Sequence, residues 1–174
     1  MKKLSILLAA FLFIFSLQSC VVSHHPNMGF FDNPHYDYKG ATFTSINVPM
    51  FLAKPIVART LREEGESEEL INLIRKVSDV KVMAVENGNP KMLADFAKYL
   101  TTNRFEEWMT VKKENETIKF QAKQAGEVIK KLMITVHSGS ELVFVDVSGK
   151  FTADDISRLI NYSEKKDVRK LVSK

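Results

Sequence analysis

The chain has 174 residues, a formal net charge of +4 at pH 7 and a single cysteine. Two of the lysines lie in an N-terminal segment that we expect to be removed, which lowers the charge of the mature chain to +2. So slight a basic excess does not indicate a nucleic-acid-binding protein. The remaining length suits one domain with a hydrophobic core, and one cysteine excludes an intramolecular disulfide, so packing must stabilise the fold.

Residues 1–19 have the pattern of a secretory signal. Lys2 and Lys3 precede an almost unbroken apolar run from Leu4 to Phe15, and small polar residues follow. A permanent membrane span needs about 20 apolar residues, so this run is too short to be one. We therefore expect residues 1–19 to be cleaved.

The residues before Cys20 indicate how the signal is cleaved. An ordinary signal peptidase prefers small residues one and three positions before the cut, and Ser19 fits whereas Leu17 does not. Leu17-Gln18-Ser19-Cys20 instead resembles the bacterial lipobox, in which the cysteine receives a diacylglyceryl group and becomes the first residue. We predict lipidation at Cys20; the alternative is an incidental thiol in a plain secreted protein.

Residues 20–40 are expected to form the lipidated cysteine and a flexible tether. Val21 to Gly40 is rich in Pro, Gly, Asn, Asp and His and shows neither helical nor strand periodicity. His24, His25 and His35 suggest a metal site, but a flexible linker would not hold ligands in fixed geometry. We predict no metal site and no cofactor.

Residues 41–174 are expected to form a single α+β domain. A strand over 41–49 is followed by helices over 50–65 and from about 68 to 77, a strand over 79–85, and a helix that Asn89-Pro90 caps and opens. At the C-terminus, Thr152 and Asp155 have the spacing of a capping box and predict a closing helix.

Residues 105–149 predict a four-stranded antiparallel meander. Turns at Asn115-Glu116, Ala125-Gly126-Glu127 and Gly139-Ser140 have the lengths of common hairpin loops. They would place Val111 opposite Phe120, Phe120 opposite Leu132, and Ile134 opposite Val145. One apolar face results, and a slip of one residue in any strand would turn its apolar set to the wrong side. We expect the helices to pack on this face.

The opposite face of the meander is then a candidate partner surface. Its proposed members are Trp108, Lys119, Lys123, Lys131, Met133 and Phe144. Aromatic and methionine side chains interleaved with lysine suit an anionic, partly apolar partner, such as envelope glycan, a lipid headgroup or a protein. An ordinary solvated sheet face is the alternative.

The run from Phe105 to Ile160 resembles the domain-of-unknown-function 4252 family, whose members are similar to small lipid-anchored proteins of Bacteroidetes-type bacteria. The resemblance rests on the acidic-aromatic opening Phe105 to Met109, the paired hairpins, and Ser148-Gly149-Lys150 before an acidic helix start. It implies an α+β fold and an envelope location, and it implies no activity.

The sequence therefore predicts a lipid-anchored protein of the bacterial envelope, on the periplasmic side of the outer membrane, with a binding or scaffolding role. No G-x-S-x-G elbow or complete phosphate loop is present. The alternatives are an envelope enzyme with a spatially assembled site and a lipoprotein whose sheet forms a homodimer.

Overall fold

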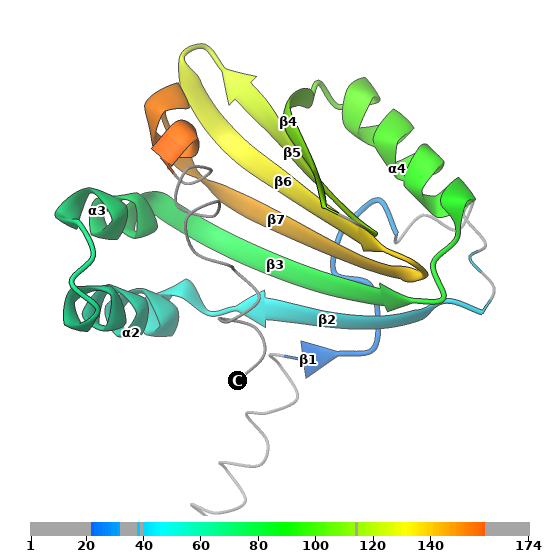
Figure 1. Cartoon of the computed structure of the whole chain (residues 1–174), viewed down its shortest axis with the longest axis horizontal. Helices are drawn as coiled ribbons and strands as arrows, with labels where there is room; N and C mark the ends of the chain where they lie inside the picture. The colour runs from blue at the N-terminus through cyan, green and yellow to red at the C-terminus, as the bar shows by residue number, and fades with distance from the viewer. Residues whose placement is uncertain (1–21, 32–37, 39, 114, 159–174) are drawn as a thin grey trace, which may run out of the picture.

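The computed structural model describes residues 22–31, 38, 40–113 and 115–158. The signal segment and Cys20 lie outside the described residues. A seven-stranded antiparallel sheet has the order β1-β2-β3-β7-β6-β5-β4 (Figure 1). Its strands are β1 (Val22–Ser23), β2 (Thr42–Val48), β3 (Val77–Glu86), β4 (Glu106–Lys113), β5 (Glu116–Ala125), β6 (Val128–Ser138) and β7 (Glu141–Phe151). Its helices are α2 (Met50–Glu63), α3 (Glu68–Lys76) and α4 (Pro90–Thr102), and a further helical segment begins at residue 153.

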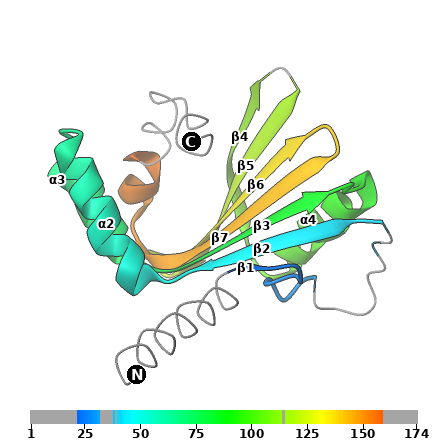
Figure 2. The ribbon, with the colours of Figure 1, turned by 90° about the horizontal axis from the view of Figure 1, so that it is seen from below.

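The predicted α+β class and the C-terminal meander β4–β7 are confirmed. Helices, however, contribute to hydrophobic clusters on both faces, not on one. α4 packs over one face, whereas α3 and the segment from residue 153 pack against one end of the other (Figure 2).

Local capping explains where the helices begin. The Ser67 side chain accepts a hydrogen bond from the Leu70 amide at the start of α3, and Asn89 accepts one from the Met92 amide at 2.8 Å at the start of α4. The predicted capping box is also present, because the Thr152 amide donates to Asp155 and the Asp155 amide donates to the Thr152 hydroxyl.

The predicted register is correct for β6–β7 and wrong by two residues for the other two hairpins. Ile134 pairs with Val145 as expected, but Phe120 pairs with Met109 and with Ile134. The reason lies in the turns. β5 begins at Glu116, which was expected in the turn, and a two-residue turn with Gly126 at φ +64° plus a bulge connects β5 to β6. A shift of two residues leaves each side chain on its predicted face.

The prediction of which face is buried is correct only at one end of the predicted face, where Phe120 and Leu132 are buried, and is wrong for the rest. The face that carries Val80, Val82, Val143, Val145 and Val147, here called the valine face, is only half-buried along its central strands. The opposite face, expected to be open, is covered by α4 and by residues 28–31. Its buried members include Ser45, Met83, Val85, Met133, Thr135, Leu142 and Phe144, and we call it the covered face.

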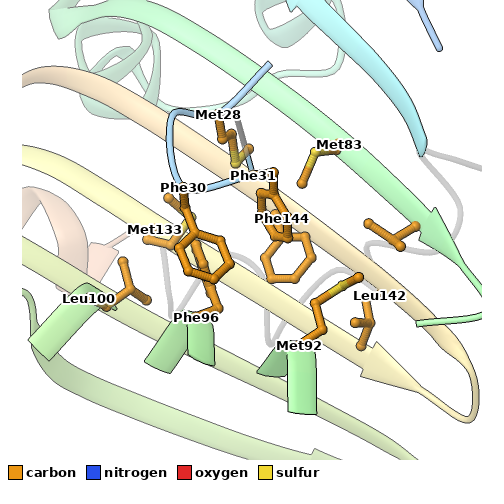
Figure 3. Packing of buried hydrophobic residues seen from close by; sticks show 11 residues of the cluster. Met28, Phe30, Phe31, Met83, Met92, Phe96, Leu100, Met133, Leu142 and Phe144 are labelled. Atoms are coloured by element: carbon orange, nitrogen blue, oxygen red, sulfur yellow. The ribbon is translucent and has the colours of Figure 1, made fainter. Parts of the chain in front are cut away.

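A short segment from the expected tether forms the centre of this core. Met28-Gly29-Phe30-Phe31, here called the strap, lies between α4 and the sheet (Figure 3). The centroid of the Phe30 ring is 5.2 Å from that of Phe96 on α4, and the centroid of Phe31 is 5.1 Å from that of Phe144 on β7. The three side chains Met28, Phe30 and Phe31 are buried, so the expectation of a flexible tether is wrong for this part of the segment.

Hydrogen bonds attach the residues before the strap to the sheet. Val22 pairs with Ile46 in the β1–β2 ladder. The Ser45 hydroxyl donates to the His25 carbonyl at 2.6 Å, and the Asn27 side-chain amide donates to the Ile46 carbonyl at 3.2 Å. Residues 22–31 therefore belong to the folded domain.

This arrangement predicts a large loss of stability when a strap ring is removed. Phe30→Ala and Phe31→Ala should each lower the free energy of unfolding by about 3–5 kcal/mol, because each leaves a cavity between α4 and the sheet. His24→Ala is the control, because His24 is exposed and lies three residues before Asn27, which directly precedes the strap. This variant should change the free energy of unfolding by less than about 0.5 kcal/mol. Urea unfolding measures all three. Equal, small effects would show that the strap is a tether after all.

Candidate binding cleft

A cleft of about 450 Å³ opens beside the strap, between α4 and the β4–β6 half of the covered face. The strap rings contact Phe144 and Phe96, whereas the cleft lies over strands farther along the sheet. The cleft is lined by Leu93, Ala94, Phe96, Ala97, Leu100, Thr101, Phe105, Glu107, Thr117, Lys119, Gln121, Thr135 and His137. The volume of the cleft is at the lower end of the range typical of small-molecule sites.

The two walls of the cleft differ in chemistry because they come from different elements. α4 contributes Leu93, Ala97 and Leu100, which recur at helical spacing on one side of the helix. The sheet contributes a polar floor, since alternate residues of a strand point to the same face. Thr117 pairs with His137 in this floor, and Lys119 and Thr135 form the next pair on the same face. A bound molecule would therefore meet an apolar wall and a hydrogen-bonding floor.

Two side chains of the floor are polar and buried. Thr135 is 6% exposed and Gln121 is 9% exposed. Thr135 Oγ1 has no hydrogen-bond partner among the described residues. Leaving a buried hydroxyl unpaired costs roughly 1–3 kcal/mol, so a group in the cleft that reached this atom would gain a hydrogen bond that the fold leaves unmade.

Charged groups lie at the edge of the floor. Glu107 accepts hydrogen bonds from the Thr110 hydroxyl at 2.8 Å and from Lys119 Nζ at 3.3 Å. The hydrogen bond from Thr110 is the main cause that lowers the pKa of Glu107. Desolvation raises this pKa, by less than the Thr110 hydrogen bond lowers it, and the hydrogen bond and charge of Lys119 lower it further. Glu107 is thus an ionised partner of Lys119 at neutral pH.

His137 is held at the end of the β6–β7 hairpin. Its Nε2 donates a hydrogen bond to the Gly139 carbonyl oxygen at 2.9 Å, because a carbonyl can only accept. In the neutral ring Nδ1 is then the acceptor. His137 also lines the cleft.

The structure separates the six residues of the predicted partner surface. Met133 and Phe144 are 4% and 0% exposed beneath the strap and α4, so their prediction as an open surface is wrong. Trp108 packs against the cluster on the opposite face, at an irregularity in the β4–β5 register.

The three lysines of that predicted surface also have separate environments. Lys119 lines the cleft. Lys123 Nζ lies 5.9 Å from the centroid of the Phe105 ring, and Lys131 forms an ion pair with Asp146 at 3.0 Å. The cleft residues Thr117, Gln121 and Thr135 were detectable as a run of polar side chains on one face of neighbouring strands, but the sequence gives no sign that α4 lies above them.

The described residues contain no group of three or more His, Cys, Asp or Glu side chains that could hold a metal ion. No helix in the described part of the chain is long and apolar enough to cross a membrane.

The fold and the cleft define an α+β protein with one antiparallel sheet and an amphipathic cleft under α4. Residues 36–159 match the family described as a domain of unknown function (DUF4252), and the chain belongs to this family. The resemblance seen in the sequence is thereby confirmed. No curated protein and no solved structure matches the chain. The strap precedes the matched residues.

Proposed function

We propose that this protein is a lipid-anchored protein of the bacterial envelope that binds a small amphipathic molecule in the cleft under α4 and does not transform it. The observation that carries the binding role is Thr135, a buried hydroxyl without a partner on the floor of the cleft. Buried polar groups in folded proteins are almost always paired, so an exception in a cleft favours a ligand site.

The lining of the cleft supports a particular class of ligand. Leu93, Ala97 and Leu100 favour an apolar surface on one side of the ligand, and the Gln121 amide and Thr135 hydroxyl favour hydroxyl or amide groups on the other. Lys119 and Glu107 already neutralise each other, so a strong net charge on the ligand is not required. A neutral molecule with one apolar and one polar side fits best.

The titratable groups favour binding over the alternative of an envelope enzyme. A general acid or base works best when its pKa lies near the working pH. The pKa of Glu107 is lowered, away from neutral pH, by its hydrogen bonds with Thr110 and Lys119. His137 binds the Gly139 carbonyl through Nε2, which leaves Nδ1 as the one ring nitrogen that could accept a proton from a molecule in the cleft.

The lipid anchor is supported by the sequence Leu17-Gln18-Ser19-Cys20 after a short apolar run. Cys20 precedes Val22, the first residue of β1, by two positions. The proposed anchor would therefore join the domain almost directly, and the periplasmic side of the outer membrane is the location we propose.

The anchor is tested by Cys20→Ala in the full chain expressed in a bacterium that processes lipoproteins. Without the thiol no diacylglyceryl group can be attached, so we expect an unprocessed precursor or a soluble protein instead of a mature membrane-bound form. Fractionation and intact-mass measurement detect the difference, with Ser19→Ala as the matched control that keeps a small residue before the cut. Normal processing and membrane flotation of Cys20→Ala would contradict the proposal.

The cleft is tested with octyl glucoside below its micelle concentration, a neutral amphipathic probe. Amide chemical shifts of the purified protein should change around Thr117, Gln121 and Thr135. Ala97→Trp places an indole in the cleft and should weaken the probe's binding at least tenfold, whereas Lys98→Trp, on a neighbouring exposed position of α4 that does not line the cleft, should not. Shifts that are spread over the surface, or equal effects of both variants, would argue against a site in the cleft.

A further inference from the structure

α2 carries an exposed apolar surface that the fold does not use. Phe51 is 78% exposed and Ile56 is 65% exposed, and Leu52 between them is also exposed. Among the described residues, the large hydrophobic side chains with high exposure all lie on α2 except Val22 of β1. Clustered exposed apolar side chains of this kind mark a surface that contacts a membrane or another molecule.

These side chains form one patch on the first half of the helix. Phe51, Leu52, Pro55 and Ile56 occupy successive turns on one side, because residues four apart in a helix lie above one another. We call these four residues the α2 patch. Ala58, two turns after Phe51 and at the border of the patch, is buried, and Met50 packs against the cluster that includes α3. The helix is therefore docked by its inner side and presents the patch outward.

The second half of α2 is charged. Arg59 forms an ion pair with Glu63 at 2.8 Å, and Arg62 forms one with Glu68 at 3.3 Å. An apolar first half followed by arginines is typical of a segment that dips into a membrane interface by one end and keeps its charges at the headgroups.

The α2 patch lies beside the proposed anchor. Val22 pairs with Ile46, and β2 ends at Val48, two residues before α2 begins at Met50. β1 and α2 thus belong to the same edge of the molecule (Figure 1). Cys20 is two residues before Val22, so the chain between them spans at most about 7 Å. A lipid on Cys20 would hold this edge at the membrane surface.

We propose that the α2 patch inserts into the surface of the membrane to which Cys20 is anchored. This inference rests on the proposed lipidation of Cys20. The short connection favours lipid as the occupant, because it leaves little room for a protein between the patch and the bilayer. A lipid chain and an inserted apolar patch together give two membrane signals, and two contacts fix an orientation that one flexible anchor would not.

The proposed contact determines which way the cleft faces. β1 forms one edge of the sheet and β4 forms the other, and the cleft lies over β4 to β6. With β1 and α2 on the membrane, the cleft is at the far side of the molecule. Its ligand would then be taken from the aqueous phase of the envelope and not from the bilayer.

The test uses the purified lipidated chain in vesicles of phosphatidylethanolamine and phosphatidylglycerol. Because Cys20 is the single cysteine and is acylated, Ile56→Cys supplies one free thiol for an NBD fluorophore. Glu127→Cys, in the exposed β5–β6 turn, is the matched control. Doxyl-labelled phospholipid in the vesicles should quench the label at position 56 at least twofold and leave the label at position 127 unchanged.

Three results would overturn the inference, and they are distinguishable. Equal, weak quenching at both positions while the protein floats with the vesicles would leave the anchor standing and remove the α2 contact. A blue-shifted label at position 56 that doxyl lipid does not quench would assign the patch to a contact with a second copy of the chain. A protein that fails to float would refute the lipid anchor and this inference with it.

Discussion

The insertion of Phe30 and Phe31 between the sheet and α4 is the interaction on which the rest of the structure depends. The buried residues of α4, Met92, Phe96 and Leu100, meet the sheet within a cluster that the strap completes. The Phe30 and Phe31 rings fill one part of the space between α4 and the sheet and form the core there. The part of this space that they do not fill is the cleft. The strap therefore sets both the stability of this half of the domain and the space available to a ligand.

The sequence predicted the elements well because their signals are local. Asn89-Pro90, the Thr152/Asp155 capping box and the turn at Gly139 each determine a boundary within a few residues. The register of β4 and β5 depends on which residues form each turn. Moving a turn by one residue shifts the strand pairing by two residues, and each side chain stays on the same face of the sheet. The buried face was not predictable from pattern, since valines line one side while Met83, Met133 and Phe144 line the other, and burial depends on what packs above.

The strap shows a second limit of the sequence pattern. Met28-Gly29-Phe30-Phe31 is an apolar cluster inside a segment rich in Pro, Asn and His, and the surrounding composition masked it. Two aromatic side chains in such a segment were the available signal for docking. Polar residues on neighbouring strands likewise indicated a floor at Thr117, Gln121 and Thr135, but the wall from α4 is a tertiary feature. The strap connects the proposed anchor at Cys20 to the core beside α4, and its docking makes residues 22–31 continuous with the domain.

Hydrogen–deuterium exchange of the full lipidated chain, resolved to peptides, tests this continuity most directly. If residues 22–31 belong to the core, a peptide spanning them should exchange slowly, with protection within about tenfold of that of the central strand β7, since both are released by the same unfolding event. The amide of Phe31, which donates to the Met28 carbonyl at 2.9 Å, should be among the protected sites. Exchange of this peptide at the rate of an unstructured chain, while β7 stays protected, would contradict the account.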